Sequence, residues 1–260
     1  MTFWDHLDEL RAAIIRILLV TVAFGVVAFF FKEELFDVVL APKEPQFVTY
    51  KVLYALAALT GNDGEGFFHV QLVSTGLAQQ FVIHMKTAMC AGVILSSPYA
   101  LYQLFRFVSP ALYAHERRYV VRVVGYGYLL FLVGVAVSYF VVFPLTFRFL
   151  GTYQVSGEVA NMITLDSLIS TLMTLTLSMG IVFEIPVLSW MFAKLGFLSA
   201  TFMRRYRKHS VVLILSVAAV ITPTSAVFTL LAVSAPMYLL FELSILIVQS
   251  TSSVKHNSLL

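Results

Sequence analysis

The sequence has little charge and almost no cysteine. Of its 260 residues 60% are apolar and only 12% are charged, whereas charged residues make up about 25% of an average soluble domain. So few polar residues cannot cover the surface of a water-soluble fold, and we therefore expect lipid to surround the chain. The single cysteine, Cys90, excludes an internal disulfide and any metal site that needs several thiolates.

Motifs of the common enzyme classes are also missing. The chain has no H-E-x-x-H zinc motif, no G-x-S-x-G nucleophile elbow and no phosphate-binding loop. Its six histidines show no ligand spacing, and a net charge of +3 is small for a nucleic-acid-binding protein. We therefore predict a protein that is not an enzyme, with no cofactor, no metal site and no nucleic-acid partner.

Long apolar segments dominate the chain. A helix needs about 20 mostly apolar residues to cross a hydrocarbon core of about 30 Å, and the candidates are residues 12–31, 81–108, 119–143, 168–193, 210–221 and 226–248. The fifth has only 12 residues, a length at which a re-entrant segment is the alternative to a span. We predict an all-α, polytopic membrane protein in which residues 1–260 form a single integral membrane domain with six transmembrane helices, the fifth and sixth being short.

Basic residues are distributed unequally in this topology. If the N-terminus lies in the cytoplasm, the inner segments hold twelve of the seventeen basic residues, including those of the run 204–208, and the outer segments hold four. An excess of Lys and Arg marks cytoplasmic segments, so we predict that both termini are cytoplasmic. The longest polar segment, 32–80, then lies outside, where we expect a cap over the helix ends.

Prolines shape the predicted helices. Pro98, Pro186 and Pro236 fall inside the second, fourth and sixth spans, where a missing N–H and a crowded carbonyl bend a helix. Pro144 marks the predicted end of the third span. Three bent helices indicate a curved wall, although any single proline can equally serve packing alone.

Glu184 is the most informative residue because it lies within the fourth apolar segment. A charged side chain at the centre of a span costs about 2.5–3.5 kcal/mol on insertion scales. Such an acid is protonated, faces a wet concavity or meets a polar group on another helix, and Pro186 leaves the carbonyl of Val182 without its usual donor. A structural hydrogen bond within the chain is the alternative. The glycines of Gly125-Tyr126-Gly127 are expected to allow close helix packing.

Two further acids, Glu9 and Glu116, occupy the basic side. Physical chemistry alone favours local salt bridges to arginines such as Arg11, which are worth about 0–1 kcal/mol at a surface. Their surroundings, however, belong to a series of short segments that resembles a known family. These segments are His6-Leu7-Asp8-Glu9-Leu10-Arg11, Ser97-Pro98, Leu101-Tyr102-Gln103, residues 107–113, His115-Glu116-Arg117-Arg118, residues 140–144, Phe183-Glu184-Ile185-Pro186, Thr222-Pro223, Pro236-Met237-Tyr238 and Phe241-Glu242.

In this order, over nearly the whole chain, the segments resemble the TatC family, a subunit of the twin-arginine protein translocase. The resemblance implies a cupped arrangement of helices in the bacterial cytoplasmic (inner) membrane. It further implies recognition of twin-arginine signal peptides and export of folded proteins together with TatA and TatB, in a hetero-oligomer of several copies. We expect the proton gradient to drive export, because the chain has no nucleotide site.

The resemblance also implies roles for particular residues. Glu9 and Glu116 would receive the arginines of the signal, with Phe107 beside them, and guanidinium pairs with carboxylate in a bidentate geometry that lysine lacks. Glu184 would face the concave groove and meet a polar group on a partner helix. Structural roles are expected for four residues, with Pro42 in the outer cap: Arg11, Pro42, Pro98 and Pro186.

The chain departs from the family pattern at one position, and one alternative function is considered. After Thr222-Pro223 the family commonly has an acid, where this chain has Ser225 and Ala226. The rival function is a proton- or solute-coupled secondary transporter that uses Glu184 to bind the coupling ion. The absence of visible inverted repeats speaks against such a transporter.

Overall fold

The structure, a computed structural model, describes residues 3–59, 72–108, 120–153, 162–222 and 226–257. Glu116, Pro223 and Ser225, which the sequence singled out, lie outside these ranges. The elements are α1 (Phe3–Phe30), α2 (Lys32–Leu40), the 3-10 helix η1 (Ala41–Lys43), α3 (Val48–Leu59), β1 (Leu72–Val73), α4 (Gln79–Val108), α5 (Val120–Val137), the π-helical segment η4 (Ser138–Val142), α6 (Phe143–Thr152), β2 (Ile163–Thr164), α7 (Leu165–Val182), α8 (Ile185–Lys194), α9 (Ala200–Arg205), α10 (Arg207–Ile221) and α11 (Val227–Asn257).

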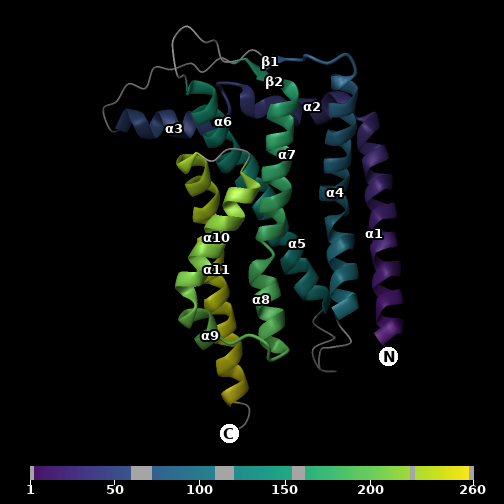
Figure 1. Cartoon of the computed structure of the whole chain (residues 1–260), viewed down its shortest axis with the longest axis vertical. Helices are drawn as coiled ribbons and strands as arrows, with labels where there is room; N and C mark the ends of the chain where they lie inside the picture. Colours follow the sequence, from purple (N-terminus) through teal and green to yellow (C-terminus); the bar gives the residue numbers. More distant parts are fainter. Residues whose placement is uncertain (1–2, 60–71, 109–119, 154–161, 223–225, 258–260) are drawn as a thin grey trace.

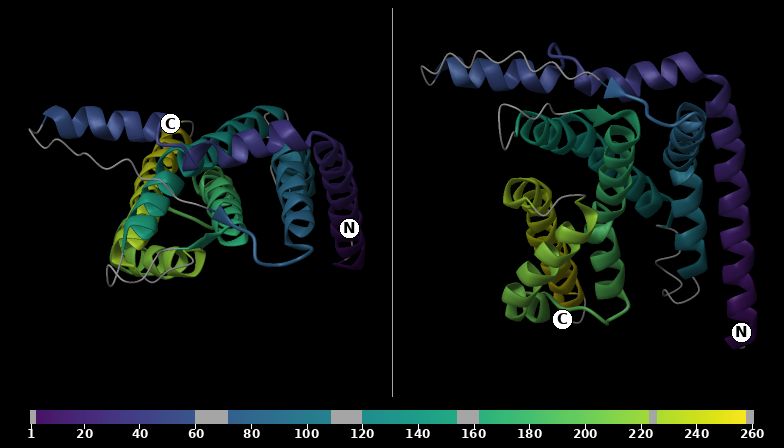
Figure 2. Two further views of the ribbon diagram at one scale, coloured as in Figure 1. Left: turned by 90° about the horizontal axis from the view of Figure 1, so that it is seen from above. Right: turned by 45° about the horizontal axis from the view of Figure 1, so that its top comes forward.

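Helices run along the long axis of the molecule, and both chain termini lie at one end (Figure 1). We call this the terminal end. The opposite, capped end carries α2 and α3, which lie across the long axis (Figure 1). Seen from above, the long helices follow a curved row from α1 at one edge to α10 and α11 at the other (Figure 2). The predicted all-α, curved membrane fold is therefore confirmed.

The helix α7 lies at the centre of the main apolar core. Its inward face buries Ile169, Leu175 and Met179 against Phe143 from the third span and Met237 from α11. The buried residues of α7 recur every three or four positions and so form one broad apolar face of the helix. Residues of the third span and of α11 thereby meet on α7.

The helices α1 and α4 pack so closely that their backbones touch. A methyl group added to Gly92 would come within 2.7 Å of the backbone nitrogen of Gly25 and of the carbonyl oxygen of Thr21. Small residues at such positions allow helices to approach in lipid. One hydrogen bond, 2.7 Å between the hydroxyl oxygens of Thr21 and Ser96, also joins the two helices.

Five helices in the described ranges are long and apolar enough to cross a membrane, namely His6–Phe30, Gln79–Phe107, Val123–Thr152, Leu165–Lys194 and Val227–Ser250. The predicted fifth span corresponds to α10, whose 15 residues give about 22 Å of helix, less than a hydrocarbon core of about 30 Å. The count of six spans therefore stays a prediction.

The expectation of a short sixth helix is wrong. The helix α11 has 31 residues, because helical structure continues past the apolar segment into the polar residues 249–257. Each of the helices α4, α7, α10 and α11 has one end that faces the capped end of the molecule. For α10 and α11 this end lies closer to the terminal end than it does for α4 and α7 (Figure 1). This part of the molecule therefore extends less far toward the capped end. The reason is the position of α10 and α11 along the long axis and not the length of α11.

The third span also differs from the prediction, because the helical path continues beyond Pro144 to Thr152. The π-helical segment η4 ends at Val142, two residues before this proline, which occupies the first turn of α6. Proline lacks an N–H and is tolerated at the first turn of a helix. The carbonyl oxygen of Phe140, four residues before Pro144, instead accepts a hydrogen bond from the Thr49 hydroxyl of α3.

The capped end is tied to the spans by hydrogen bonds. The buried hydroxyl of Tyr50 donates to the carbonyl oxygens of Pro42, at 3.0 Å, and Pro144, at 3.3 Å. Burial raises the pKa of this phenol above its ordinary range. The structure therefore places Pro42 in the cap, buried, and gives its carbonyl a defined partner.

Candidate functional site

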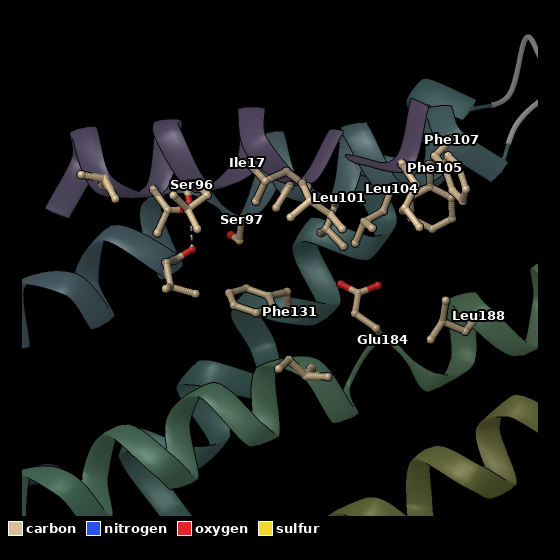
Figure 3. A pocket seen from close by; sticks show the side chains of 18 of the residues that line it. Ile17, Ser96, Ser97, Leu101, Leu104, Phe105, Phe107, Phe131, Glu184 and Leu188 are labelled. Atoms are coloured by element: carbon tan, nitrogen blue, oxygen red, sulfur yellow. Dashed lines mark hydrogen bonds between the residues drawn. The ribbon is translucent and has the colours of Figure 1, made fainter. Parts of the chain in front are cut away.

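A groove of about 810 Å³ lies between α1 and α4 on one side and α5, α7 and α8 on the other. Its α1 wall consists of residues spaced three or four apart, which form one face of a helix: Leu10, Ile14, Ile17, Leu18, Thr21 and Val22. Figure 3 shows Leu101, Leu104 and Phe105 of α4 on the same side, with Phe131 of α5 and Leu188 of α8 opposite. The lining is almost wholly apolar.

Glu184 lies at the interruption between α7 and α8 and points into this groove (Figure 3). Pro186 occupies the first turn of α8, so its missing N–H falls where the helix of α7 has ended. The chain therefore turns at Glu184 instead of continuing as a straight helix. The sequence predicted a bend at Pro186, and the structure has an interruption of the helix there.

The carboxylate of Glu184 is buried but has no hydrogen-bond partner among the described residues. The residue is 6% exposed, and neither carboxylate oxygen has a donor within reach. The alternative of an internal hydrogen bond to a neighbouring helix thus finds no donor in the part of the chain that the structure describes. Leaving a buried polar group unsatisfied costs about 1–3 kcal/mol. The side chain is therefore able to accept a donor supplied from the groove.

Gly127 of α5 makes room for this carboxylate. A methyl group built on Gly127 would lie 3.0 Å from one oxygen of Glu184, whereas a methyl group on Gly125 would meet nothing within 4 Å. The prediction that these glycines allow close packing is confirmed for Gly127 and wrong for Gly125. No sequence signal distinguishes the two, since the contact joins residues of different helices.

A pair of hydroxyls forms the polar part of the groove nearest the capped end. Thr21 and Ser96, joined by the hydrogen bond described above, both line it. Beside them, the hydroxyl of Ser97 donates to the carbonyl oxygen of Ile94 at 2.7 Å. This carbonyl lies four residues before Pro98, which has no N–H to offer, and Ser or Thr side chains commonly satisfy such freed groups in membranes. Pro98 itself stays inside the continuous helix α4.

The groove ends near Phe107 at the terminal end. The Phe107 ring lines the groove and stacks on His6 of α1, with 4.2 Å between the ring centroids. Glu9 is exposed on the same helix, next in sequence to the groove residue Leu10. Arg11 is exposed too, and within the described ranges it makes no ion pair with Glu9. The structure thus brings Phe107 and Glu184 to one groove and Glu9 to its edge.

These features define an α-helical, multi-pass membrane protein with an apolar groove that holds one buried acid. The family of Sec-independent protein translocase proteins, TatC, matches residues 5–236. The chain belongs to the TatC family.

Individual relatives extend the similarity over almost the whole length. The Sec-independent protein translocase protein TatC of Koribacter versatilis is 35% identical over 246 residues, which cover 94% of this chain and 84% of the relative. That of Blattabacterium sp. from Periplaneta americana is 31% identical over 252 residues, covering 95% and 94%. A crystal structure of the twin-arginine translocase receptor TatC covers 94% of this chain and 97% of its own, with a TM-score of 0.74 at 28% identity. A second, obtained in DDM, has a TM-score of 0.76 at 27% identity and covers 93% of this chain and 98% of its own.

Proposed function

We propose that this protein is the signal-peptide receptor and core subunit of a twin-arginine translocase in the cytoplasmic (inner) membrane of a bacterium. Residues 1–260 act as one integral membrane domain, with the terminal end and both termini in the cytoplasm. The observation that carries the proposal is the apolar groove that runs from Phe107 past Glu184, in a chain of the TatC family.

The groove has dimensions that suit the apolar stretch of a signal peptide. Its α1 wall extends from Leu10 to Val22, which at about 1.5 Å per residue is about 18 Å. A helix of about 12 residues has this length. An apolar helix is held there by packing against side chains of α1 and α4, while its polar start remains at the terminal end.

The arginine pair of the signal precedes this apolar stretch and is met by Glu9 and Glu116. Carboxylate and guanidinium form bidentate, charge-assisted hydrogen bonds, which an ammonium cannot reproduce. Glu9 is exposed at the edge of the groove, where such a partner has access. The Phe107 ring, already stacked on His6, provides a face beside this position on which a guanidinium can lie.

Glu184 receives a donor from the transmembrane helix of a small partner of the TatA or TatB type. Neither of its oxygens has a partner in the part of the chain that the structure describes, and hydrogen bonds across helices in lipid are worth about 0.6–2 kcal/mol. The partner helix contributes to a hetero-oligomer of several copies. The proton gradient, rather than a nucleotide, drives export of the folded cargo.

Binding of twin-arginine and twin-lysine signal peptides to the full chain in nanodiscs tests the receptor role. We expect Glu9→Gln to weaken binding of the twin-arginine peptide about tenfold, the equivalent of about 1.4 kcal/mol, and to affect the twin-lysine peptide far less. Asp8→Asn is the matched control, because Asp8 is the neighbouring exposed acid on α1 and faces another direction. Equal losses for both peptides, or equal losses in both variants, contradict direct pairing.

Photocrosslinking tests whether the signal peptide binds in the groove or elsewhere on the surface. A photoreactive residue at Leu18 or Leu104, both in the groove, is expected to crosslink the apolar stretch of the signal, while one at the lipid-facing Leu19 is not. Leu19 is not among the residues that line the groove, and its side chain leaves α1 about 100° around the helix from that of Leu18. Crosslinks from Leu19 alone would refute groove binding. Solute uptake by the purified chain in liposomes would instead favour the secondary transporter.

A further inference from the structure

We propose that the corner between α9 and α10 is a binding site for the headgroups of anionic phospholipids in the leaflet at the terminal end. This corner consists of residues 197–209, defined here as the α9–α10 corner. It connects two segments that run along the long axis, α8 and α10, at the terminal end of the molecule (Figure 1). In the proposed topology the corner lies at the depth of lipid headgroups. The proposal goes beyond signal recognition and concerns a different surface.

Aromatic rings form one face of the corner. The rings of Phe202 and Tyr206 lie 4.6 Å apart between centroids, and those of Tyr206 and His209 lie 5.4 Å apart. Phe197 is 79% exposed and Phe202 is 54% exposed. Aromatic side chains are enriched where a membrane protein passes from hydrocarbon to headgroups. An exposed aromatic ladder at this depth is suited to contact with lipid.

Two cations hold the corner in place on α11. Arg207 forms an ion pair with Glu242, 2.6 Å between nitrogen and oxygen, and the Tyr238 hydroxyl donates to the other oxygen of Glu242 at 3.0 Å. Arg204 donates to the side-chain oxygen of Gln249. Both contacts use side chains of α11, so they fix the backbone of the corner and do not compete for lipid.

Two other cations, Arg205 and Lys208, are exposed and have no ion-pair or hydrogen-bond partner within the described ranges. No acidic residue occurs in the sequence between Glu184 and Glu242, so no carboxylate of the corner itself neutralises them. Two cations beside exposed aromatic rings form the kind of basic and amphipathic surface that binds anionic lipid. The negative phosphodiester of a lipid headgroup has the charge that pairs with these two cations.

Binding at the corner would determine where the bilayer adapts to α10. The 15 residues of α10 give about 22 Å of helix, about 8 Å less than a hydrocarbon core of about 30 Å. If headgroups hold Arg205 and Lys208, the helix begins at the headgroup level of that leaflet. The whole mismatch then falls at the capped end, where the opposite leaflet must move inward.

Quenching of a single tryptophan by brominated lipid tests the proposal on the full chain. The reporter is Phe202→Trp in a background of Trp4→Phe and Trp190→Phe, reconstituted in phosphatidylcholine vesicles with increasing brominated phosphatidylglycerol. We expect Arg205→Gln with Lys208→Gln to raise the lipid fraction needed for half quenching at least about fivefold, the equivalent of about 1 kcal/mol. The matched control is Lys32→Gln with Lys51→Gln, which removes two exposed cations near the capped end and leaves the value unchanged.

The charge-conserving pair Arg205→Lys with Lys208→Arg keeps the lipid preference if charge is responsible. Should the neutral variant fail to fold, a salt series on the unsubstituted reporter decides, since screening lowers a preference that depends on charge. The proposal is overturned if brominated phosphatidylcholine quenches the reporter as well as brominated phosphatidylglycerol does. It is also overturned if the preference for phosphatidylglycerol survives both salt and neutralisation of the two cations. If the protein binds a soluble polyglutamate peptide but shows no preference for phosphatidylglycerol, the proposal is overturned in favour of an acidic protein partner.

Discussion

Replacing Glu184 by leucine is expected to stabilise the isolated protein. The carboxylate is 6% exposed and its oxygens have no partner among the described residues, so the folded chain bears the cost of an unsatisfied buried polar group, about 1–3 kcal/mol. Leucine removes this cost, and its own transfer to the membrane is favourable by about 0.3–0.6 kcal/mol. We therefore expect the free energy of unfolding to rise by about 1–3 kcal/mol.

The same substitution is expected to abolish the proposed contact with a partner helix. An apolar side chain offers no acceptor, so a stabilised protein would lose assembly, as happens where function needs a strained site. Unfolding titrations in mixed micelles measure the stability of the purified chain. Disulfide crosslinking between the groove and a cysteine-scanned partner helix measures assembly in membranes, and Glu184→Gln, which keeps an acceptor, is expected to retain part of the crosslink.

The result that refutes this reasoning is a loss of stability. If Glu184→Leu lowers the free energy of unfolding by more than about 1 kcal/mol, the carboxylate has a partner inside the folded chain. Gly127→Ala serves as an independent check, because its methyl group would approach the carboxylate to 3.0 Å. We expect this variant to weaken the partner crosslink while changing stability by less than about 1 kcal/mol, since the Glu184 side chain can move toward the groove.

Two further predictions concern stability away from Glu184. Gly92→Ala is expected to lower the free energy of unfolding by about 1–3 kcal/mol, because the methyl group would overlap the backbone of α1 at 2.7 Å; Gly125→Ala, with open space around it, is the control, and an equal loss there would contradict the packing argument. Tyr50→Phe is expected to cost about 1 kcal/mol through the lost hydrogen bond to Pro42. Because burial raises the pKa of Tyr50, its contribution is complete below the ordinary tyrosine pKa of about 10 and falls as pH rises above it. A phenolate absorbance titration near pH 10 that changes on Tyr50→Phe would show the phenol to be accessible.

Much of this protein could be predicted from its sequence because lipid imposes simple rules. A span must be long, apolar and helical, since no water satisfies its backbone groups, and this rule located each long helix. Three of the helix ends were nevertheless predicted nine residues short, because α1 begins at Phe3, the third span ends at Thr152 and α11 ends at Asn257. The same rule made Glu184 conspicuous, since a lone acid inside an apolar segment is costly wherever the helix lies. Glu9 and Phe107 needed the family resemblance, because acids and aromatics at a helix start and end carry no strong physical signal alone.

Other features depended on contacts between distant residues and were decided only by the tertiary structure. Pro144 was expected to end its helix, but the π-helical turn before it and the cap above it let the helix continue. The partnering of Thr21 with Ser96, 75 residues apart, and the position of Gly127 against Glu184 follow from how helices pack. Periodicity and length act within one segment and therefore fix the segments. Which faces meet, and hence where a groove remains open, depends on the shapes of all the segments together.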